Sequence, residues 1–472
     1  MKKIVLMSLF SALIFVGLFL SFNLFFKSEV VERFIWNMNT FHGMFANLPD
    51  NLPKEDILGS YAYAFRDYYR HLPRTVAANA TYYAFLLAFF ISLFISQHLC
   101  KKLDFNHFRR LSFYMLIIAV GLFARFFFAY HTTGNHDMAS WYINKSVLDA
   151  GGNMFAVTDR YNYSPFWFLV LKFLTSVNHL FPQFPFMFIV RSFLIVIDLI
   201  TLGFLVSIAK KMNLSSLKTG ALFFLSPITI IITGYHGQFD NIPVLFVLFA
   251  IYVFLTFGKK SVLFGWLLLT IGMIAKHEIL QQILIFLKHT QAKHKTIFFL
   301  FTLSVVLFLL SFAPYWPEGQ ERIIKNVLSY GGMNRSYGFV NFHANPTLGL
   351  IHKFLFISLL LVWPFIYRIK DLVKSSLMGM LFFLVFSSGI STQQFILPVA
   401  LGALQPNAGF FLFTTAASFL LFGNIDELKI SFFKGMTWNH VWFCALIWFL
   451  VELKNNKLKN TDKKRHLSPS AT

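Results

Sequence analysis

Long apolar stretches, separated by short clusters of basic residues, are the feature that most constrains how this chain can fold. Hydrophobic residues make up 57% of its 472 residues and charged residues only 13%, whereas a soluble domain is usually about a quarter charged. A stretch of about 20 apolar residues is long enough to cross the hydrocarbon core of a bilayer as a helix. The sequence therefore predicts an all-α, polytopic membrane protein with one integral membrane domain.

The excess of basic residues fits the same interpretation. Lys and Arg number 41 against 20 Asp and Glu, which gives a formal net charge of +21. In a soluble protein this excess would suggest nucleic acid as a partner. Here the basic residues lie between apolar stretches, as the positive-inside rule describes, so no nucleic acid is expected. Cys100 and Cys444 lie in or beside apolar stretches and predict neither a disulfide nor a metal site.

Basic clusters mark the loops that should face the cytoplasm. They are Lys2/Lys3, Lys101/Lys102/Arg109/Arg110, Lys210/Lys211/Lys218, Lys259/Lys260, Lys288/Lys293/Lys295, Arg368/Lys370/Lys374 and the tail from Lys454 to Arg465. Placing spans between them predicts about fourteen crossings, with both termini in the cytoplasm. The predicted spans are 4–26, 80–100, 111–130, 186–209, 218–235, 242–257, 262–275, 279–288, 296–313, 346–366, 376–389, 394–406, 408–423 and 437–453.

The predicted spans also divide the chain into regions. The stretch at 4–26 is expected to be an uncleaved anchor, because no clear small-residue cleavage site follows it. An N-terminal two-span extension at 1–110 then precedes a core at 111–406. C-terminal spans and a basic cytoplasmic tail occupy 407–472.

The outer face is expected to carry three substantial loops, at 27–79, 131–185 and 314–345. These loops hold most of the polar residues outside the basic clusters, so any chemistry should face outward. Ser164–Phe181 is apolar enough to cross, but a crossing there would place the Lys210 cluster outside. The segment is therefore predicted to be amphipathic or re-entrant on the outer face. The alternative is a true span with inverted topology downstream.

Two groups of polar residues near the predicted outer face could carry chemistry. Asp137 follows a predicted span by a few residues, where a carboxylate can act as a general base toward a substrate at the lipid boundary; it could equally be a solvated loop acid. The segment Gly234–Asn241 contains His236, Gln238 and Asp240. Such residues are costly in hydrocarbon and usually mark a cavity, although Asp240 could simply cap a helix.

Further candidates lie later in the chain. Lys276 and His277 sit between two short apolar stretches at the predicted outer face, where a cation could bind a phosphate or extend to the membrane interface. Arg335 is a second candidate cation with the same alternative. Gln393 and Gln394 could line a cavity or form a plain turn.

The charged residues within predicted spans have a simpler interpretation. Asp198 follows Arg191 by two helical turns, so the two share a helix face without touching. Asp198 is expected to tie helices together rather than to take part in chemistry.

The order of these motifs resembles the GT-C superfamily of polyprenyl-phosphate-sugar-dependent glycosyltransferases, most closely bacterial mannosyltransferase-like members related to GPI mannosyltransferases. The resemblance covers about 111–406 and implies a GT-C-like bundle. It implies that Asp137 is the catalytic base and that Tyr163 and Pro165 line the same outer cavity, although Ser164 stands where a proline is common. Gln238 and Asp240 correspond to a Gln-Asp motif. The substrate-binding set expected around the base is His136, Tyr163, Pro165, His236, Gln238, Asp240, Lys276, His277, Arg335, Gln393 and Gln394.

The expected reaction is inverting transfer of a hexose, mannose or glucose, from a polyprenyl-phosphate donor to a glycan or glycolipid acceptor outside the cytoplasm. No cofactor is indicated, and the sequence leaves a divalent metal open. The expected location is a bacterial plasma membrane, or the endoplasmic reticulum in a eukaryote. A transporter or lipid flippase is the alternative, because it would also use intramembrane charges and interrupted helices. A structural subunit of a membrane complex is a third interpretation.

Overall fold

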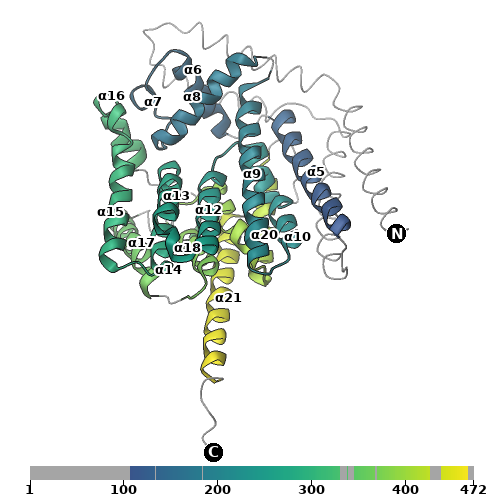
Figure 1. Cartoon of the computed structure of the whole chain (residues 1–472). Coiled ribbons are helices and arrows are strands. Elements are labelled where there is room, and N and C mark those ends of the chain that lie inside the picture. Colours follow the sequence, from purple (N-terminus) through teal and green to yellow (C-terminus); the bar gives the residue numbers. More distant parts are fainter. Residues whose placement is uncertain are drawn as a thin grey trace, which may run out of the picture.

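The structure is a computed structural model whose described part is entirely helical (Figure 1). It describes residues 107–132, 134, 136–182, 184–329, 337–338, 345–366, 369–387, 389–425 and 437–465. The absence of strands in these ranges confirms the predicted all-α class. The predicted spans 4–26 and 80–100, the outer loop 27–79 and Arg335 lie outside the described residues.

Several of the helices are long and apolar enough to cross a membrane, as a multi-pass membrane protein requires. Within the described ranges five helical stretches meet this test: Phe113–Tyr130, Phe186–Lys211, Asn241–Ala275, His294–Leu328 and Thr347–Ile366. Asn241–Ala275 is not one straight helix, because its two halves fold back on each other. Ser216–Phe224 and Pro227–His236 meet at 45° and make a sixth if the bent pair is one span.

Among the described residues, fewer helices pass this test of length and apolarity than the fourteen crossings predicted, so that number is not confirmed. Three further apolar helices, Leu372–Phe386, Thr392–Leu404 and Ala408–Gly423, are shorter. Leu372–Phe386 is also buried along nearly its whole length, so its apolar residues face other helices, and hydropathy alone cannot distinguish a core helix from a span.

Five helices come first in the described chain, and the three shorter ones among them lie together at one end of the molecule. They are α5 (His107–His131), α6 (His136–Asp149), α7 (Met154–Val157), α8 (Pro165–Leu180) and α9 (Phe186–Lys211). Helices α6, α7 and α8 lie together at the top of Figure 1. Helix α8 is not among the candidate spans; it buries one side, including Trp167 and Leu171, and exposes Phe173. Leu169 is exposed as well, so apolar side chains lie on both sides of α8, and its predicted amphipathic or re-entrant placement stays a prediction.

The segment after α9 contains a bend and a helical hairpin. Its elements are α10 (Ser216–Phe224), α11 (Pro227–Ile231), the π-helix η1 (Ile232–His236), α12 (Asn241–Phe257), η2 (Gly258–Ser261) and α13 (Val262–Ala275). Helices α12 and α13 pack against each other. The chain therefore folds back at Gly258, whose φ of +57° suits glycine. As a result, the start of α12 and the end of α13 lie at the same end of the hairpin.

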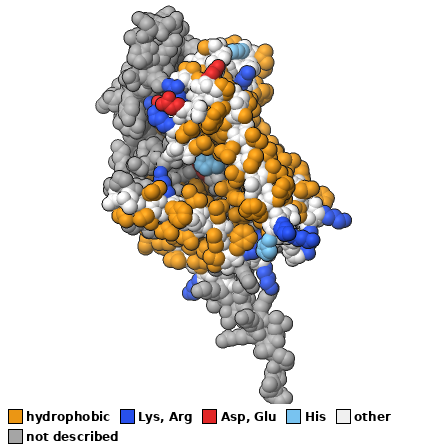
Figure 2. Space-filling view, turned by 90° about the vertical axis from the view of Figure 1, so that its left-hand side faces the viewer, with side chains coloured by type: hydrophobic (Ala, Val, Ile, Leu, Met, Phe, Trp, Pro, Cys, Tyr) orange, Lys and Arg blue, Asp and Glu red, His pale blue; other side chains and the backbone are white. Residues whose placement is uncertain are grey.

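The remaining elements complete the bundle. They are η3 (His277–Ile279), α14 (Leu280–His289), α15 (His294–Leu310), η4 (Ala313–Tyr315), α16 (Trp316–Arg322), η5 (Ile323–Leu328), α17 (Pro346–Ile366), α18 (Leu372–Phe386), η7 (Thr392–Ile396), α19 (Leu397–Leu404), α20 (Ala408–Gly423) and α21 (Trp438–Arg465). Helix α18 packs against α14 and α21. On the face in Figure 2, hydrophobic side chains cover most of the area between charged groups near the two ends.

Helix α9 runs from one end of the molecule to the other. It begins beside α8 and finishes at Lys210 and Lys211. A helix of 26 residues is about 39 Å long, so this basic cluster lies far from α8. That separation agrees with the expectation that the segment 131–185 and the Lys210 cluster face opposite sides.

A buried polar network joins α5, α9, η1 and α12. Asp198 accepts hydrogen bonds from Arg125 Nε at 2.8 Å, Thr233 Oγ1 at 3.0 Å and Asn241 Nδ2 at 3.0 Å. Arg125 also donates to Thr229 Oγ1 at 2.9 Å. Asp198 therefore ties helices together, as predicted. Its partner is Arg125 on another helix, and not the helix neighbour Arg191.

Candidate functional site

An ion-pair cluster occupies the end of the α12–α13 hairpin. Asp240, directly before α12, places its Oδ1 2.7 Å from Nζ of Lys276, which directly follows α13. Glu278 in η3 places its Oε1 3.8 Å from the same nitrogen. Asp240 is fully buried, and Lys276 is 6% exposed. The fold-back at Gly258 brings these groups together, although 36 positions separate Asp240 from Lys276.

Gln394 connects this cluster to the later part of the chain. Its side-chain Oε1 accepts from the backbone N of Ser391 at 2.9 Å, in a capping box at the start of η7. Its Nε2 donates to Glu278 Oε1 at 2.5 Å. The buried side-chain amide of Gln394 therefore accepts a backbone hydrogen bond at the start of η7 and donates one to the carboxylate of Glu278.

Asp137 lies in the first turn of α6 and is partly exposed. Its charge acts on Asp240, Lys276 and His236, so the four groups lie within electrostatic range of one another. One helical turn after Asp137, Trp141 donates from Nε1 to the Gly237 carbonyl at 3.0 Å. This bond fixes the start of α6 against the segment that carries His236.

Arg191 holds the backbone on both sides of this contact. Its guanidinium donates to the carbonyls of Ala129 at 3.0 Å and Thr132 at 2.8 Å, at the end of α5. It also donates to the Tyr235 carbonyl in η1 at 2.6 Å. Gly134 (φ +81°) passes so close that an added Cβ would lie 2.2 Å from Arg191 Nη2. The connection into α6 thus needs glycine for its backbone conformation and for space.

Aromatic rings form the wall beside Lys276. Trp167 stacks on Phe239 with ring centroids 4.1 Å apart, and Tyr163 meets Phe239 at 5.0 Å. Trp141 lies 5.5 Å from both Tyr163 and Trp167. The Lys276 ammonium sits 5.0 Å from the Phe239 centroid and 5.5 Å from that of Tyr163. These ring faces add cation–π attraction to the ion pair.

The start of α8 is anchored to the same hairpin. Pro165 is at the first turn of α8 and is buried. Ser164 before it donates its hydroxyl to the Ile274 carbonyl, two positions before Lys276. Tyr161 donates its hydroxyl to the Ser164 carbonyl at 2.6 Å. A proline at 164 could not donate to Ile274, so serine at this position has a structural role.

Burial and crowding of charges alter the acidity of the cluster, which lies just outside the candidate span Asn241–Ala275. Burial raises the pKa of Asp240 to about 7 against the opposing effect of Lys276, and Glu278 and Asp137 add to the rise. Burial alone would lower the pKa of Lys276, but Asp240, Glu278 and Asp137 raise it above its usual value. Three carboxylates thus face one ammonium, which stays charged.

Several buried polar atoms here have no hydrogen-bond partner among the described residues. They include both side-chain polar atoms of Gln238, Oε2 of Glu278 and Nδ1 of His236. Such atoms are rare in folded proteins and call for an explanation such as a ligand. His277, at the edge of the cluster, is exposed, while Asp137 and Tyr163 are partly exposed. The groups therefore run from a buried floor to an accessible rim.

The structure brings together most of the residues singled out from the sequence. Asp137, Tyr163, His236, Asp240, Lys276 and Gln394 belong to this cluster by the contacts and electrostatic effects above, and Pro165 anchors its wall. Gln238 lies between His236 and Asp240 in the chain, and His277 at the rim. His136 is the first residue of α6. No contact joins Gln393 to the cluster in the described residues, and Arg335 lies outside them.

Glu278 is the site residue that sequence reasoning passed over. It stood in the Lys-His-Glu segment, and its signal was an acid beside a lysine at the end of a short apolar stretch. Within the described ranges, no group of three or more His, Cys, Asp or Glu residues could hold a metal ion.

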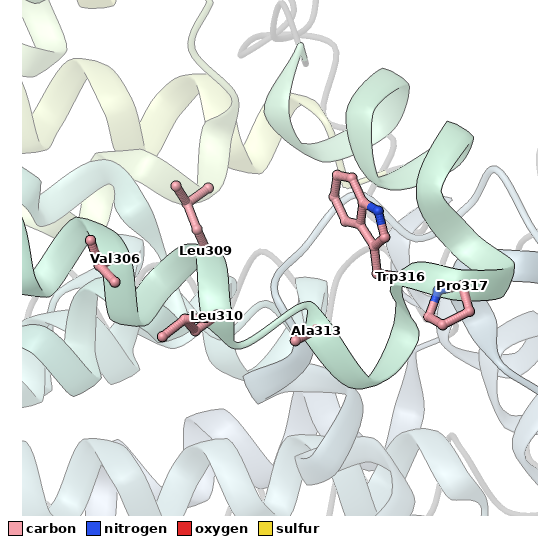
Figure 3. A pocket seen from close by; sticks show the side chains of 6 residues that line it. All are labelled: Val306, Leu309, Leu310, Ala313, Trp316 and Pro317. Atoms are coloured by element: carbon pink, nitrogen blue, oxygen red, sulfur yellow. The ribbon is translucent and has the colours of Figure 1, made fainter.

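An apolar hollow lies elsewhere, on the outer side of α15. Its volume is about 410 Å³, and six side chains from α15, η4 and α16 line it: Val306, Leu309, Leu310, Ala313, Trp316 and Pro317 (Figure 3). None of them can titrate. Phe308, on another side of α15, meets His277 with ring centroids 6.2 Å apart. Helix α15 therefore stands between the hollow and the ion-pair cluster.

Comparison of the chain with protein-family models, curated proteins and solved structures gave no match. The assignment of a function therefore rests on the cluster itself.

Proposed function

We propose that this chain is an integral-membrane glycosyltransferase of the GT-C type, which transfers a hexose from a polyprenyl-phosphate donor to a glycan or glycolipid acceptor. The observation that carries the proposal is the placement of Asp137 beside the buried Asp240–Lys276–Glu278 cluster. A partly exposed carboxylate at the rim suits a general base. The unpartnered buried atoms beside it suit the hydroxyls of a sugar. Mannose and glucose are the proposed hexoses.

In the proposed reaction Asp137 takes the proton of an acceptor hydroxyl. The acceptor oxygen forms a bond to the anomeric carbon, while the bond from that carbon to the phosphate oxygen breaks. The lipid phosphate leaves with the bonding electron pair, and attack from the opposite face inverts the anomeric configuration. No nucleotide site is required, because the donor sugar reaches the protein on a lipid.

We propose a smaller part in this chemistry for Lys276 than the sequence suggested. Its ammonium is already paired with Asp240 and flanked by Glu278, so a phosphate would have to compete with two carboxylates. We propose that Lys276 holds these carboxylates together and opposes the rise in the pKa of Asp240. Arg335 remains the predicted phosphate partner. About fourteen crossings and the GT-C arrangement of spans also remain part of the proposal.

The test is transfer by purified protein in proteoliposomes. Labelled polyprenyl-phosphate mannose and polyprenyl-phosphate glucose are supplied separately, together with lipid-linked glycans extracted from the source membranes. We expect label from one donor to enter the glycan fraction with inverted anomeric configuration. Donor that stays intact with every acceptor fraction would contradict the proposal. Passage of intact donor to the other leaflet would instead favour the flippase, which could also use buried charges.

A further inference from the structure

Two buried glutamates at different places in the bundle have closely similar surroundings. Glu278 accepts from Gln394 Nε2 at 2.5 Å and lies 3.8 Å from Lys276 Nζ. Glu452 on α21 accepts from Asn407 Nδ2 at 2.5 Å and lies 3.2 Å from Lys374 Nζ. Each is thus a buried carboxylate held by one amide and one lysine.

The two glutamates differ in how their oxygens are used. In Glu452, Oε1 accepts from the amide of Asn407 and Oε2 faces Lys374, so both oxygens are engaged. In Glu278, the amide of Gln394 and the ammonium of Lys276 both approach Oε1. Its Oε2 is buried and has no hydrogen-bond partner among the described residues. Leaving a buried charged acceptor unpaired is costly, since a bond to a charged group normally contributes stability.

We propose that Oε2 of Glu278 accepts a hydrogen bond from a hydroxyl of an uncharged carbohydrate, and that Glu278 is a specificity-determining residue of the ion-pair cluster. This inference rests on the proposed function, because it concerns the same cluster, but it is a claim about binding. Glu278 is placed to orient a sugar, and Gln238, two positions before Asp240, offers an unpartnered donor and acceptor.

The charges around Glu278 favour a neutral polyol over an anion. Asp240, Glu278 and Asp137 face the single ammonium of Lys276, which is already paired. A phosphate or carboxylate ligand would meet like charges here, and such contacts are unfavourable. Sugar hydroxyls can donate to carboxylates, and the charge-assisted bonds that result are strong.

The rim fits the same ligand class. Tyr163 is partly exposed and packs edge-on against Phe239, so part of its ring remains available to the apolar C–H face of a sugar. His277 is exposed at the same edge and can donate or accept a hydrogen bond. A ring, an imidazole and carboxylates are a combination suited to a sugar and poorly suited to a purely apolar ligand.

The test measures equilibrium binding to the full-length protein in nanodiscs by saturation-transfer NMR. The ligands are methyl α-mannoside, methyl α-glucoside and inorganic phosphate. Glu278→Gln retains an oxygen for Gln394 and replaces the acceptor Oε2 with an NH2 donor. Its matched control is Glu452→Gln, which makes the same change in the other glutamate that contacts one amide and one lysine. We expect Glu278→Gln to weaken glycoside binding about tenfold or more, Glu452→Gln to leave it unchanged, and inorganic phosphate not to compete with the glycoside.

A second measurement needs no variant and therefore does not depend on how Glu278→Gln folds. Monodeoxy glycosides are titrated against the wild-type protein, and removal of one particular hydroxyl is expected to cost about tenfold in affinity. Equal binding of all monodeoxy analogues, or full glycoside affinity in Glu278→Gln, would overturn the inference. Binding without any sugar transfer would leave it standing and contradict the proposed function alone.

Discussion

Lys276 and Asp240 join the two ends of a helical hairpin through a 2.7 Å ion pair that is almost completely buried. The lysine follows α13 and the aspartate precedes α12. Burying either charge alone would be unfavourable, so the two side chains stabilise each other. Tyr163 and Phe239 lie beside the ammonium. The pair is therefore part of the fold as well as part of the candidate site.

Removing the ammonium should destabilise the protein. Lys276→Met leaves Asp240 and Glu278 buried without their cation, and breaking a buried pair typically costs about 3–5 kcal/mol. Lys276→Arg retains the charge and should lose less. Thermal unfolding in detergent measures the effect, with Lys260→Met at an exposed position as the control.

The double variant Lys276→Met/Asp240→Asn shows whether the two residues stabilise the protein as a pair or independently. If the ion pair matters, the second change should restore part of the stability, because it removes the uncompensated carboxylate. Strictly additive losses would show that the two residues act separately.

The pH dependence of stability should report Asp240. Its pKa of about 7 in the folded protein lies above the ordinary value of 3.8, so the folded protein binds more protons than the unfolded chain between these values. Stability from this group is therefore fully present below about pH 4 and falls as pH rises to about 7. Asp240→Asn should flatten this decline in the thermal midpoint.

Asp159→Asn is the control for this pH profile. A hydrogen bond from Asn326 and nearby Lys325 and Arg322 lower the pKa of Asp159, so its contribution has the opposite sign and is lost only as pH falls. The decline between about pH 4 and 7 should persist in this variant. A profile of Asp240→Asn that matches wild type would contradict the raised pKa.

The two ends of the bundle should face opposite sides of the membrane. Ser176 on α8 and Lys260 in η2 are exposed and therefore suit labelling. In a background without Cys100 and Cys444, Ser176→Cys should react with an impermeant maleimide on intact cells. Lys260→Cys should react only after permeabilisation. The reverse result would place the candidate site in the cytoplasm.

Hydropathy and the basic clusters were enough to predict that Asp137, Asp240 and Lys276 all lie at the outer face, whereas their grouping around one base was implied by the family resemblance. Each follows or precedes an apolar stretch at its predicted outer end, and helix ends on one side of a bundle must gather there. Gln394 was named for a related reason, since it interrupts two apolar stretches.

Other features depend on packing that a sequence pattern does not contain. The contact between Glu278 and Gln394 joins residues 116 positions apart and depends on how η7 docks against η3. Helical spacing placed Arg191 and Asp198 on one face, but Asp198 pairs with Arg125 while Arg191 binds backbone carbonyls. Both are buried polar groups that need hydrogen-bond partners. The sequence pattern alone did not show which of the neighbouring groups each one would bind.

Asp137→Asn is the sharpest test of the proposed mechanism. The change keeps the size and polarity of the side chain but removes its basicity, so sugar transfer should slow by roughly 10²–10⁴-fold. Asp137→Glu should also fail largely, because the extra methylene moves the carboxylate away from the acceptor hydroxyl. Asp149→Asn is the control on the same helix, where the carboxylate pairs with Lys145 and His179. Both Asp137 variants should retain the wild-type thermal midpoint to within a few degrees, since Asp137 is partly exposed, whereas Asp149→Asn leaves the buried Lys145 without its partner and can lower the midpoint. Near-normal transfer by Asp137→Asn would remove this residue from the mechanism and make Asp240 the next carboxylate to substitute.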